Sequence, residues 1–343
     1  MSTRCRWSMH MARLATVLLC AQPVAAQPAK LPALGADPAR ISVSGLSAGA
    51  FMAVQYDVAF SASTVGVGVV AGGPYNCAYV NIGGIVACTK GSPDGAASYD
   101  AAASFAALGQ IDPVERLKSQ RVYLFSGTRD PKVKRAVVAA VRDFFIAAGT
   151  PAKNLQYVRD VPAGHGFISA NFGAACGRTV TPYVNECSVN GTPYDQPEAV
   201  LTEIYGELLP KAASLSASPQ AFDQTEFALP VAGIARTGYV YVPASCAEAA
   251  ARCAVHVVFH GCEQGAAAVG DAVYGRVGYN QWADANRIIV LYPQVNPSTS
   301  PDNPRGCWDW WGYTGLNFQT QSGPQLAAVR AMVERLVSRP GAR

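Results

Sequence analysis

The chain has 343 residues, of which 50% are hydrophobic and 15% are charged, a balance typical of a globular protein with a large core and not of a disordered one. Its formal net charge is +4, and no run of Lys or Arg accompanies it. Binding to nucleic acid or to an anionic membrane surface therefore gains no support, and polyanionic substrates are not expected.

The first 26 residues have the composition of a secretory signal. Arginines precede the apolar stretch LATVLLCAQPVAA, which ends in small residues before Gln27. This stretch is too short to span a membrane, and no later segment reaches about 18 uninterrupted apolar residues. Cys20 could mark a lipoprotein anchor, but Leu19 precedes it where a small residue is expected. We therefore expect residues 1–26 to be a signal peptide and the product to be secreted or periplasmic.

The cysteines fit an oxidising destination. Ten are present, and two of them fall in the signal, which leaves an even number in the mature chain. Four disulfides are plausible, although eight cysteines allow 105 connectivities. No CxxC occurs and histidines are few, so neither a metal site nor a cofactor is expected. Pairs close in sequence could staple loops, namely Cys77/Cys88, Cys176/Cys187 and Cys246/Cys253, which leaves Cys262 with Cys307.

Strand-like and helix-like segments alternate along the mature chain. Such alternation predicts an α/β fold, in which helices cover both faces of a mostly parallel sheet. The loops richest in Pro, Ser and Asn are too short to be interdomain tethers, so residues 27–343 are expected to form one catalytic domain. In chain order, strands are expected at 41–45, 65–73, 121–130, 154–164, 237–243, 254–262 and 287–295, helices at 131–149 and 323–339, and loops at 177–197, 213–220 and 296–306.

The sequence GLSAG follows directly on the first expected strand. Gly-x-Ser-x-Gly between a strand and a helix is the nucleophile elbow, in which the glycines relieve crowding so that a strained serine projects its oxygen at the strand end. The pattern alone is weak because short Gly/Ser strings are common in loops. The strand before it and the helix-like run after it favour Ser47 as a nucleophile.

A nucleophilic serine needs a base, and the base needs an acid that fixes its tautomer. The chain has four histidines. His10 lies in the signal, His256 lies within an apolar strand, and His260 begins a His-Gly turn, so structural roles are expected for the last two. His165 lies in the Gly-flanked loop VPAGHGF after a strand and is the predicted base.

Asp130 is the predicted acid. It ends the expected strand 121–130 and precedes Pro131, which would place it at the carboxyl edge of the sheet. Asp112 and Asp160 lack that placement. The alternative is that Asp130 only caps the following helix.

The order Ser, Asp, His is that of α/β-hydrolases, but Ser47 comes unusually early in the chain. The strands that ordinarily precede the elbow are predicted near the other end, at 255–265 and 287–294, and the helix at 323–339 would lead into the elbow strand. This pattern predicts a circular permutation, which is tolerated where the termini are exposed and close together.

The oxyanion of the reaction needs two hydrogen-bond donors. We expect them to be the backbone N–H of Ala48, immediately after the nucleophile, and that of Cys262 in the His-Gly-Cys turn. A Cys262–Cys307 disulfide would join this turn to the Trp-rich loop at 305–313. Trp310 and Trp311 in that loop are expected to be packing residues.

Several segments in order resemble one known family and cover most of the mature chain. They are similar to the single-domain poly(3-hydroxybutyrate) depolymerases, which are circularly permuted α/β-hydrolases. The segments are SGLSAGAFMAVQYDVAFS, GVGVVAGGPYNCA, LFSGTRDP, VPAGHGF, VVFHGCEQ, NQWADANRIIVLYPQ and NPRGCWDWWGY.

The resemblance implies the same catalytic residues and adds two residues at the substrate crevice. Ser47, Asp130 and His165 match the catalytic positions, and Cys262 matches the backbone oxyanion donor. The resemblance also implies that Trp308, with Asn303 nearby, forms a wall of the substrate crevice.

The implied function is that of a secreted serine esterase. It would act as a monomer without a cofactor and hydrolyse poly(3-hydroxybutyrate) to short oligomers or monomer through an acyl-enzyme. Multidomain relatives carry a polymer-adsorbing module, for which this chain has no room, so exposed apolar loops would have to replace it. The alternatives are an exported carboxylesterase acting on acetylated or feruloylated polysaccharide and a non-catalytic polymer-binding surface protein.

Overall fold

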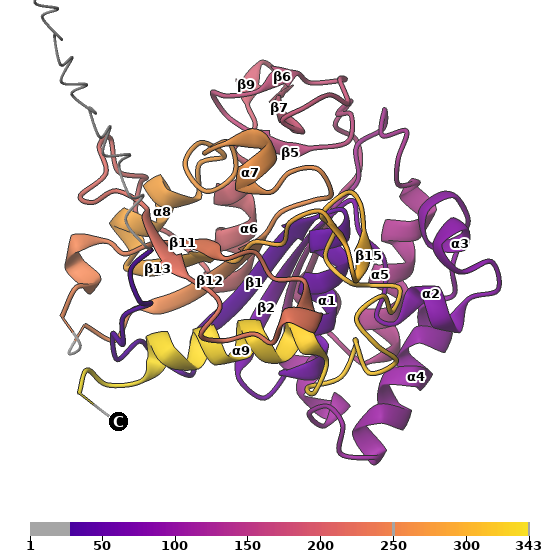
Figure 1. Ribbon diagram of the computed structural model, residues 1–343. Helices are drawn as coiled ribbons and strands as arrows, with labels where there is room; N and C mark the ends of the chain where they lie inside the picture. The colour runs from indigo at the N-terminus through magenta and orange to yellow at the C-terminus, as the bar shows by residue number, and fades with distance from the viewer. Residues whose placement is uncertain (1–27, 249–250, 342–343) are drawn as a thin grey trace, which may run out of the picture.

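The structure is a computed structural model that describes residues 28–248 and 251–341, and its centre is an eight-stranded sheet (Figure 1). The strands are β1 (Ile41–Leu46), β2 (Thr64–Val70), β3 (Arg121–Phe125), β4 (Leu155–Val158), β10 (Gln220–Asp223), β11 (Thr237–Tyr241), β12 (Ala254–Phe259) and β13 (Ile288–Tyr292). Their order across the sheet is β10-β11-β13-β12-β1-β2-β3-β4. Neighbours run parallel from β13 to β4, and β11 runs antiparallel to both of its neighbours. The predicted, mostly parallel sheet is confirmed.

Helices cover both faces of this sheet. Side chains alternate between the faces along a strand. In β1, Ser42 and Ser44 bond to tyrosines of α6 and α8, whereas a Cβ atom on Gly45 would touch α1. Thus α6 and α8 lie on one face, and α1 lies on the other beside α9. The longer helices are α1 (Ala48–Ala59), α4 (Gly95–Ala107), α5 (Arg135–Ala147), α6 (Gln196–Tyr205), α8 (Tyr279–Asn286) and α9 (Pro324–Val337).

Every residue of β1 is buried, so its two serines need partners inside the protein. His256 of β12 supplies them, because its Nδ1 lies 2.7 Å from Ser42 Oγ and its Nε2 lies 2.8 Å from Ser44 Oγ. Burial lowers the pKa of His256 to about 3, so the ring stays neutral. The expected structural role of His256 agrees with this placement.

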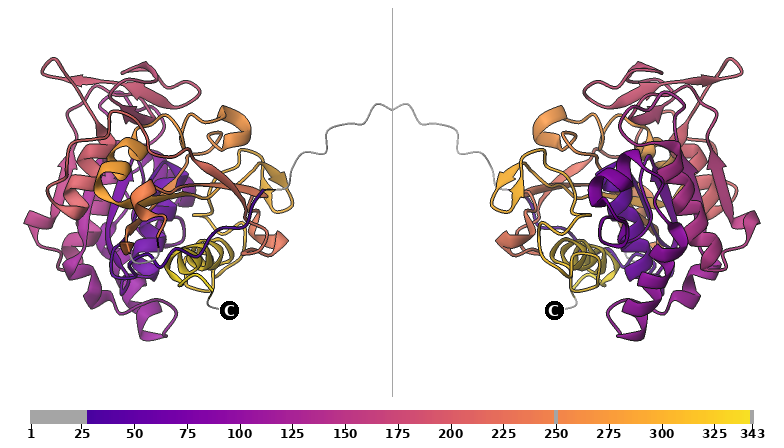
Figure 2. Two further views of the ribbon diagram at one scale, coloured as in Figure 1. Left: turned by 90° about the vertical axis from the view of Figure 1, so that its left-hand side faces the viewer. Right: turned by 90° about the vertical axis from the view of Figure 1, so that its right-hand side faces the viewer.

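The two ends of the described chain meet at one side of the sheet. The N–H groups of Leu34 and Ala36 donate to the carbonyl of Leu336, and that of Gly35 donates to the carbonyl of Ser338. Figures 1 and 2 show the indigo N-terminal segment running beside the yellow helix α9. β1 lies between β12 and β2, so strands from late in the sequence fill the half-sheet that ordinarily precedes the elbow. The predicted circular permutation is confirmed.

Some boundaries differ from the expected ones. The strands expected at 121–130 and 154–164 end earlier, at Phe125 and Val158. Beyond these residues the two segments continue as neighbouring loops, and Thr128 N–H of one donates to Val161 O of the other. The expected loop 177–197 contains short strands, namely β7 (Val184–Glu186), β8 (Ser188–Val189) and β9 (Thr192–Pro193). Two more short strands, β5 (Phe167–Ser169) and β6 (Ala174–Ala175), precede it. The expected loop 296–306 contains a hairpin of β14 (Ser298–Thr299) and β15 (Asp302–Asn303).

Disulfides fasten four of the loops; three pairs are those suggested by sequence proximity, and the fourth joins the two cysteines that remained, Cys262 and Cys307. Three close short loops, with separations of 11, 11 and 7 residues, and the fourth spans 45 residues. One of the short loops holds two small helices, α2 (Cys77–Val80) and α3 (Gly84–Lys90). Another short helix, α7 (Ala266–Val269), follows β12. The predicted disulfide-stapled loops are confirmed.

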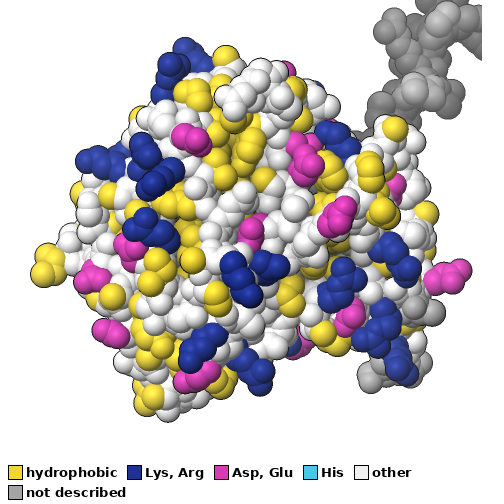
Figure 3. All heavy atoms as spheres, turned by 180° about the vertical axis from the view of Figure 1, so that it is seen from behind, with side chains coloured by type: hydrophobic (Ala, Val, Ile, Leu, Met, Phe, Trp, Pro, Cys, Tyr) yellow, Lys and Arg dark blue, Asp and Glu magenta, His cyan; other side chains and the backbone are white. Residues whose placement is uncertain are grey.

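The expected signal peptide, residues 1–26, lies outside the described residues. Within 28–248 and 251–341, no helix is long and apolar enough to cross a membrane. Figure 3 shows one face of the molecule, where basic and acidic side chains are interspersed with apolar ones.

Candidate active site

Ser47 lies at the junction between β1 and α1 in a strained conformation, with φ 57° and ψ −123°. Its N–H donates to Val70 O (2.9 Å), and its carbonyl accepts from the N–H of Ala50 (2.9 Å). The two glycines of the motif permit the tight turn, because a Cβ atom on Gly45 would lie 2.2 Å from Gly49 O. The elbow predicted from GLSAG is therefore present at the carboxyl end of β1.

Asp130 and His165 form a buried pair on the loops that follow β3 and β4. Asp130 Oδ2 lies 2.8 Å from His165 Nδ1, and the two side chains are only 2% and 7% exposed. The other oxygen, Oδ1, accepts from the N–H groups of Lys132 (2.7 Å) and Val133 (3.0 Å). Asp130 thus fixes a turn and also orients His165; it does not cap the following helix, because α5 begins at Arg135 after Lys134.

The loop that carries His165 is held in place by neighbouring backbone. His165 N–H donates to Thr179 Oγ1 (2.8 Å). Its flanking glycines are needed because Cβ atoms on Gly164 and Gly166 would lie 2.2 Å from Arg178 O and 2.8 Å from Tyr183 O. The disulfide Cys176–Cys187 brackets the segment that makes these contacts.

Ser47 and His165 line the same cavity, which has a volume of about 290 Å³. In the described part of the chain, no hydrogen bond joins the Ser47 hydroxyl to His165. In ligand-free structures such catalytic hydrogen bonds are often long and tighten only with substrate. The lining residues are Leu46, Ser47, Ala48, Phe51, Ile85, Thr89, Lys90, Lys132, Val133, His165, Tyr183, Gly261, Cys262, Glu263, Arg305, Cys307, Trp310 and Trp311.

The two expected oxyanion donors, Ala48 and Cys262, also line this cavity. Neither backbone N–H donates to another group within the residues that the structure describes. Gly49 allows α1 to approach the turn after β12, because a Cβ atom there would lie 2.4 Å from the carbonyl oxygens of both Phe259 and His260. The two N–H groups therefore remain available to a ligand at one end of the cavity.

Buried side chains fix the turn that carries Cys262. Gly261 N–H donates to Gln264 Oε1 (2.8 Å), and Gln264 Nε2 donates to the carbonyl of Tyr183 (2.9 Å). His260 Nδ1 bonds to Gly261 O (2.7 Å), and its Nε2 accepts from Val295 N–H (3.2 Å). Burial lowers the pKa of His260 to about 4, so the ring is neutral. The structural role expected for His260 agrees with these contacts.

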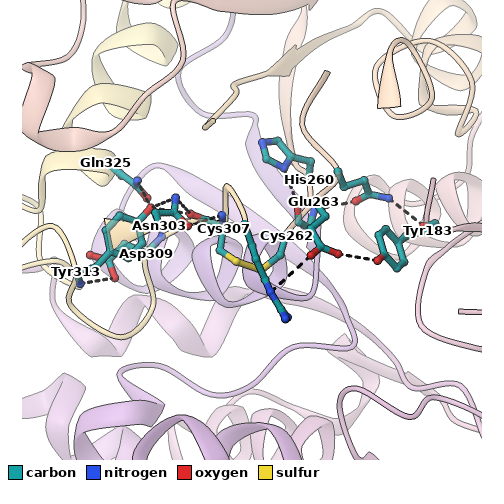
Figure 4. Close-up of a disulfide and its surroundings, with 12 residues drawn as sticks. Tyr183, His260, Cys262, Glu263, Asn303, Cys307, Asp309, Tyr313 and Gln325 are labelled. Atoms are coloured by element: carbon teal, nitrogen blue, oxygen red, sulfur yellow. Dashed lines mark hydrogen bonds and ion pairs between the residues drawn. A yellow bond between two sulfur atoms is a disulfide. The ribbon is translucent and has the colours of Figure 1, made fainter. Parts of the chain in front are cut away.

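Cys262 is joined to Cys307, and a polar network holds the Cys307 side of this disulfide (Figure 4). Asn303 Oδ1 accepts from Cys307 N–H (2.8 Å), and its Nδ2 donates to Cys307 O (2.9 Å) and to the Tyr313 hydroxyl (3.0 Å). Asp309 organises the rest of the loop by accepting backbone N–H groups from Trp311 to Thr314. Asn303 is buried and does not line the cavity, so it supports the site from behind.

The tryptophans lie differently from the expectation, which placed Trp308 in the crevice wall and Trp310 and Trp311 in core or rim packing. Trp308 is fully buried, packs edge-on against Phe259 at 5.0 Å between ring centroids, and does not line the cavity. Trp310 and Trp311, expected to be packing residues, form part of the cavity wall, and Trp310 stacks on Phe51 at 4.1 Å. The turn that Asp309 organises decides this difference, because it directs the last two rings toward the cavity.

Sequence reasoning missed several charged residues of the site. Lys90, Lys132, Glu263 and Arg305 all line the cavity. They lie on the surface rim, where a charged residue in the sequence is ordinary, so no sequence signal marked them. Their shared position depends on four segments that are far apart in the sequence.

Known proteins match both the sequence and the fold, although no protein-family model matches the chain. The chain is 40% identical over 336 residues to a poly(3-hydroxybutyrate) depolymerase of Delftia acidovorans, a match that covers 95% of this chain and 65% of that protein. It is 36% identical over 326 residues to a polyhydroxybutyrate depolymerase of Talaromyces funiculosus, a match that covers 90% and 92% of the two chains.

Two solved structures agree with this relationship. The crystal structure of PHB depolymerase from Penicillium funiculosum matches with a TM-score of 0.82 at 35% identity, covering 90% of this chain and 98% of that one. A serine-to-alanine variant of PHB depolymerase complexed with an R3HB trimer matches with a TM-score of 0.83, at the same identity and coverage. The chain therefore belongs to the poly(3-hydroxybutyrate) depolymerase family.

Proposed function

We propose that the protein is a secreted serine esterase that hydrolyses poly(3-hydroxybutyrate) or closely related polyesters to short oligomers or monomer. Residues 27–343 would act as a single catalytic domain and as a monomer, after removal of residues 1–26. The observation that carries the proposal is the convergence of the Ser47 elbow, the Asp130–His165 pair and two available backbone donors on one cavity.

In the proposed acylation step, His165 accepts the Ser47 proton as the serine oxygen attacks the ester carbonyl carbon. With Nδ1–H donating to Asp130, the tautomer leaves Nε2 as the basic nitrogen. The oxyanion is stabilised by the N–H groups of Ala48 and Cys262, and the positive end of the α1 dipole lies at the same place. His165 then donates its proton to the departing alcohol oxygen.

Deacylation repeats the sequence with water as the nucleophile. His165 takes a proton from the water, the hydroxide attacks the acyl-enzyme carbonyl, and the collapse returns the proton to Ser47. The released product carries a carboxylate.

The walls of the cavity suit an aliphatic polyester. Phe51, Ile85, Val133, Trp310 and Trp311 contribute apolar surface around Ser47. Such a lining accepts methyl-branched ester chains and offers few hydrogen bonds to the many hydroxyls of a polysaccharide.

Exposed apolar side chains beside the cavity support contact with a solid polymer. Ile82 is fully exposed and Val86 is 66% exposed, and both lie on the α2–α3 segment whose Ile85 lines the cavity. Tyr79 of the same segment is half exposed. Apolar surface of this kind marks an interaction site and would lie against the polymer while an ester group reaches the cavity.

Export is proposed from the sequence of residues 1–26, and the four disulfides support an oxidising destination. Both relatives are named as depolymerases of polyhydroxybutyrate, which supports the same substrate class here.

The test compares substrates on the purified mature protein. Clearing of an amorphous poly(3-hydroxybutyrate) suspension and release of 3-hydroxybutyrate products are measured beside ester release from acetylated xylan and feruloylated polysaccharide. The proposal predicts faster turnover of the polyester, and Ser47→Ala should abolish hydrolysis while keeping adsorption. Faster turnover of the polysaccharide esters would favour the carboxylesterase, and adsorption without hydrolysis by the unaltered protein would favour a binding protein.

A further inference from the structure

The charged side chains around the cavity are not distributed evenly. On one side, Glu263 lies 3.6 Å from Arg305 and accepts a hydrogen bond from the Tyr183 hydroxyl (2.8 Å). That side is therefore internally compensated. Lys90 and Lys132 also line the cavity. Lys90 is the last residue of α3, and Lys132 lies in the loop before α5.

Backbone contacts hold the end of α3, which carries Lys90, against the loop that carries Lys132. The Lys90 ammonium donates to the carbonyl oxygen of Pro131, the residue directly before Lys132. The end of α3 is tied to the same loop, because Lys134 N–H donates to Thr89 O (2.9 Å). The disulfide at Cys88 anchors α3 two residues before Lys90.

Neither ammonium group has a carboxylate within 4.0 Å among the residues that the structure describes. The nearest acid in sequence, Asp130, is committed elsewhere, because its oxygens bond to His165 and to backbone N–H groups. Two cations that line one cavity without a counter-charge would both be stabilised by an anion bound in it. The rim is thus arranged to attract an anion into a cavity whose remaining walls are mainly apolar.

The interior of a polyester chain is neutral and gives these lysines no counter-charge. The carboxyl end of a chain is an anion, and each cleavage creates another. Building on the function proposed above, we propose that Lys90 and Lys132 bind the terminal carboxylate of an oligomeric hydroxyalkanoate while one of its ester groups lies at Ser47. The enzyme would then prefer oligomers that end in a free acid over the same oligomers with a blocked end.

The test compares kcat/KM for a 3-hydroxybutyrate trimer as the free acid and as its methyl ester. Exposed ion pairs contribute little each, so the ratio of acid to methyl ester should be about fivefold at low ionic strength. It should fall toward one in about 0.5 M salt, where screening is strong. In the double variant Lys90→Gln, Lys132→Gln the ratio should be about one at low salt as well.

The double variant Lys118→Gln, Lys153→Gln serves as the matched control, because both lysines lie outside the cavity wall and the variant removes the same two charges. This control should keep the ratio of the unaltered protein. A ratio is insensitive to the fraction of folded enzyme, so poor folding of the double variant would not imitate the expected result.

The outcomes separate the two proposals. Hydrolysis of the methyl ester by the unaltered protein tests the ester hydrolase itself. If that ester is cleaved but the free acid has no advantage, or if the advantage survives in the double variant, the carboxylate site is overturned and the esterase stands. If neither trimer is cleaved, the proposed function fails first.

Discussion

Gly49 and His260 are in such close contact that a Cβ atom on Gly49 would lie 2.4 Å from the His260 carbonyl oxygen. This contact sets how near α1, which carries the Ala48 N–H, can come to the turn that carries the Cys262 N–H. Both partners of the contact are backbone, so neither can move aside as a flexible side chain would.

The first prediction concerns this contact. Gly49→Ala should force α1 and the turn apart, displace one oxyanion donor and lower kcat on a soluble ester by about tenfold to a thousandfold. Ala53→Gly in the same helix is the control, since it weakens the helix by about 1 kcal/mol without crowding the turn. Wild-type kcat in folded Gly49→Ala protein would contradict the proposed oxyanion site.

Asp130 gives a second prediction, because it both caps a turn and orients His165. In Asp130→Asn the side-chain oxygen can still accept from the N–H groups of Lys132 and Val133, so the turn should remain. The amide NH₂ facing His165 would favour the wrong tautomer, and kcat should fall by a factor on the order of 10⁴. Circular dichroism checks the fold, and steady-state kinetics checks the loss. A variant that keeps more than a tenth of the activity would rule out this role.

The third prediction separates the catalytic from the stabilising effect of disulfides. Replacing Cys262 and Cys307 by Ser should lower kcat by about tenfold, because the turn loses its link to the Trp-rich loop. Loop-closure entropy suggests a stability cost of about 4 kcal/mol for this 45-residue loop.

The remote pair Cys246–Cys253 is the matched control. It closes a loop of only 7 residues, so its replacement by Ser should cost about 2 kcal/mol and leave kcat unchanged. The comparison is made by measuring kcat of both variants at a temperature at which both are folded. Equal kcat values in the two variants would show that the link at Cys262 has no catalytic effect.

Asp57 provides a prediction about stability and pH. It is fully buried in α1, and neither carboxylate oxygen has a hydrogen-bond partner in the part of the chain that the structure describes. Burial raises its pKa from 3.8 to about 7. Below pH 4 both the folded and the unfolded state hold the proton, so Asp57 has no pH-dependent cost there.

Between pH 4 and 7 the unfolded state releases this proton while the folded state keeps it, and the free energy of unfolding should fall. The full loss, roughly 4 kcal/mol, is present above pH 7. Asp57→Asn should therefore gain stability relative to the unaltered protein as the pH rises from 4 to 8, measured by urea unfolding. The exposed residue Asp100, changed to Asn, should show no such trend. A flat difference for Asp57→Asn across this range would refute the argument.

The sequence predicted the centre of the fold well because that part depends on regular patterns. β1, β12 and β13 are buried runs between turn signals, and the order of the motifs along the chain revealed the permutation. Three of the disulfides join cysteines that are close in sequence, where short loops limit the choices, and the fourth followed from them.

The loops were predicted less well because no regular period governs them. In WDWWG the orientation of each ring depends on the Asp309 turn and not on alternation, so Trp308 and Trp310 exchanged places relative to the expectation. Likewise, the position of Lys90 beside Lys132 depends on α3 docking onto a distant loop. Asp94 and Asp195 directly precede helices α4 and α6, and each side chain accepts the N–H group three residues on, a capping signal that could have located both helices.

Catalysis at this site requires that His165 activate the Ser47 hydroxyl. Covalent labelling with a fluorophosphonate, followed by mass spectrometry of the peptides, measures that activation. We expect a single modified residue, Ser47, and a labelling rate that falls by at least about a hundredfold in His165→Ala, in line with general-base contributions. Modification of another residue, or labelling of His165→Ala at the rate of the unaltered protein, would contradict it.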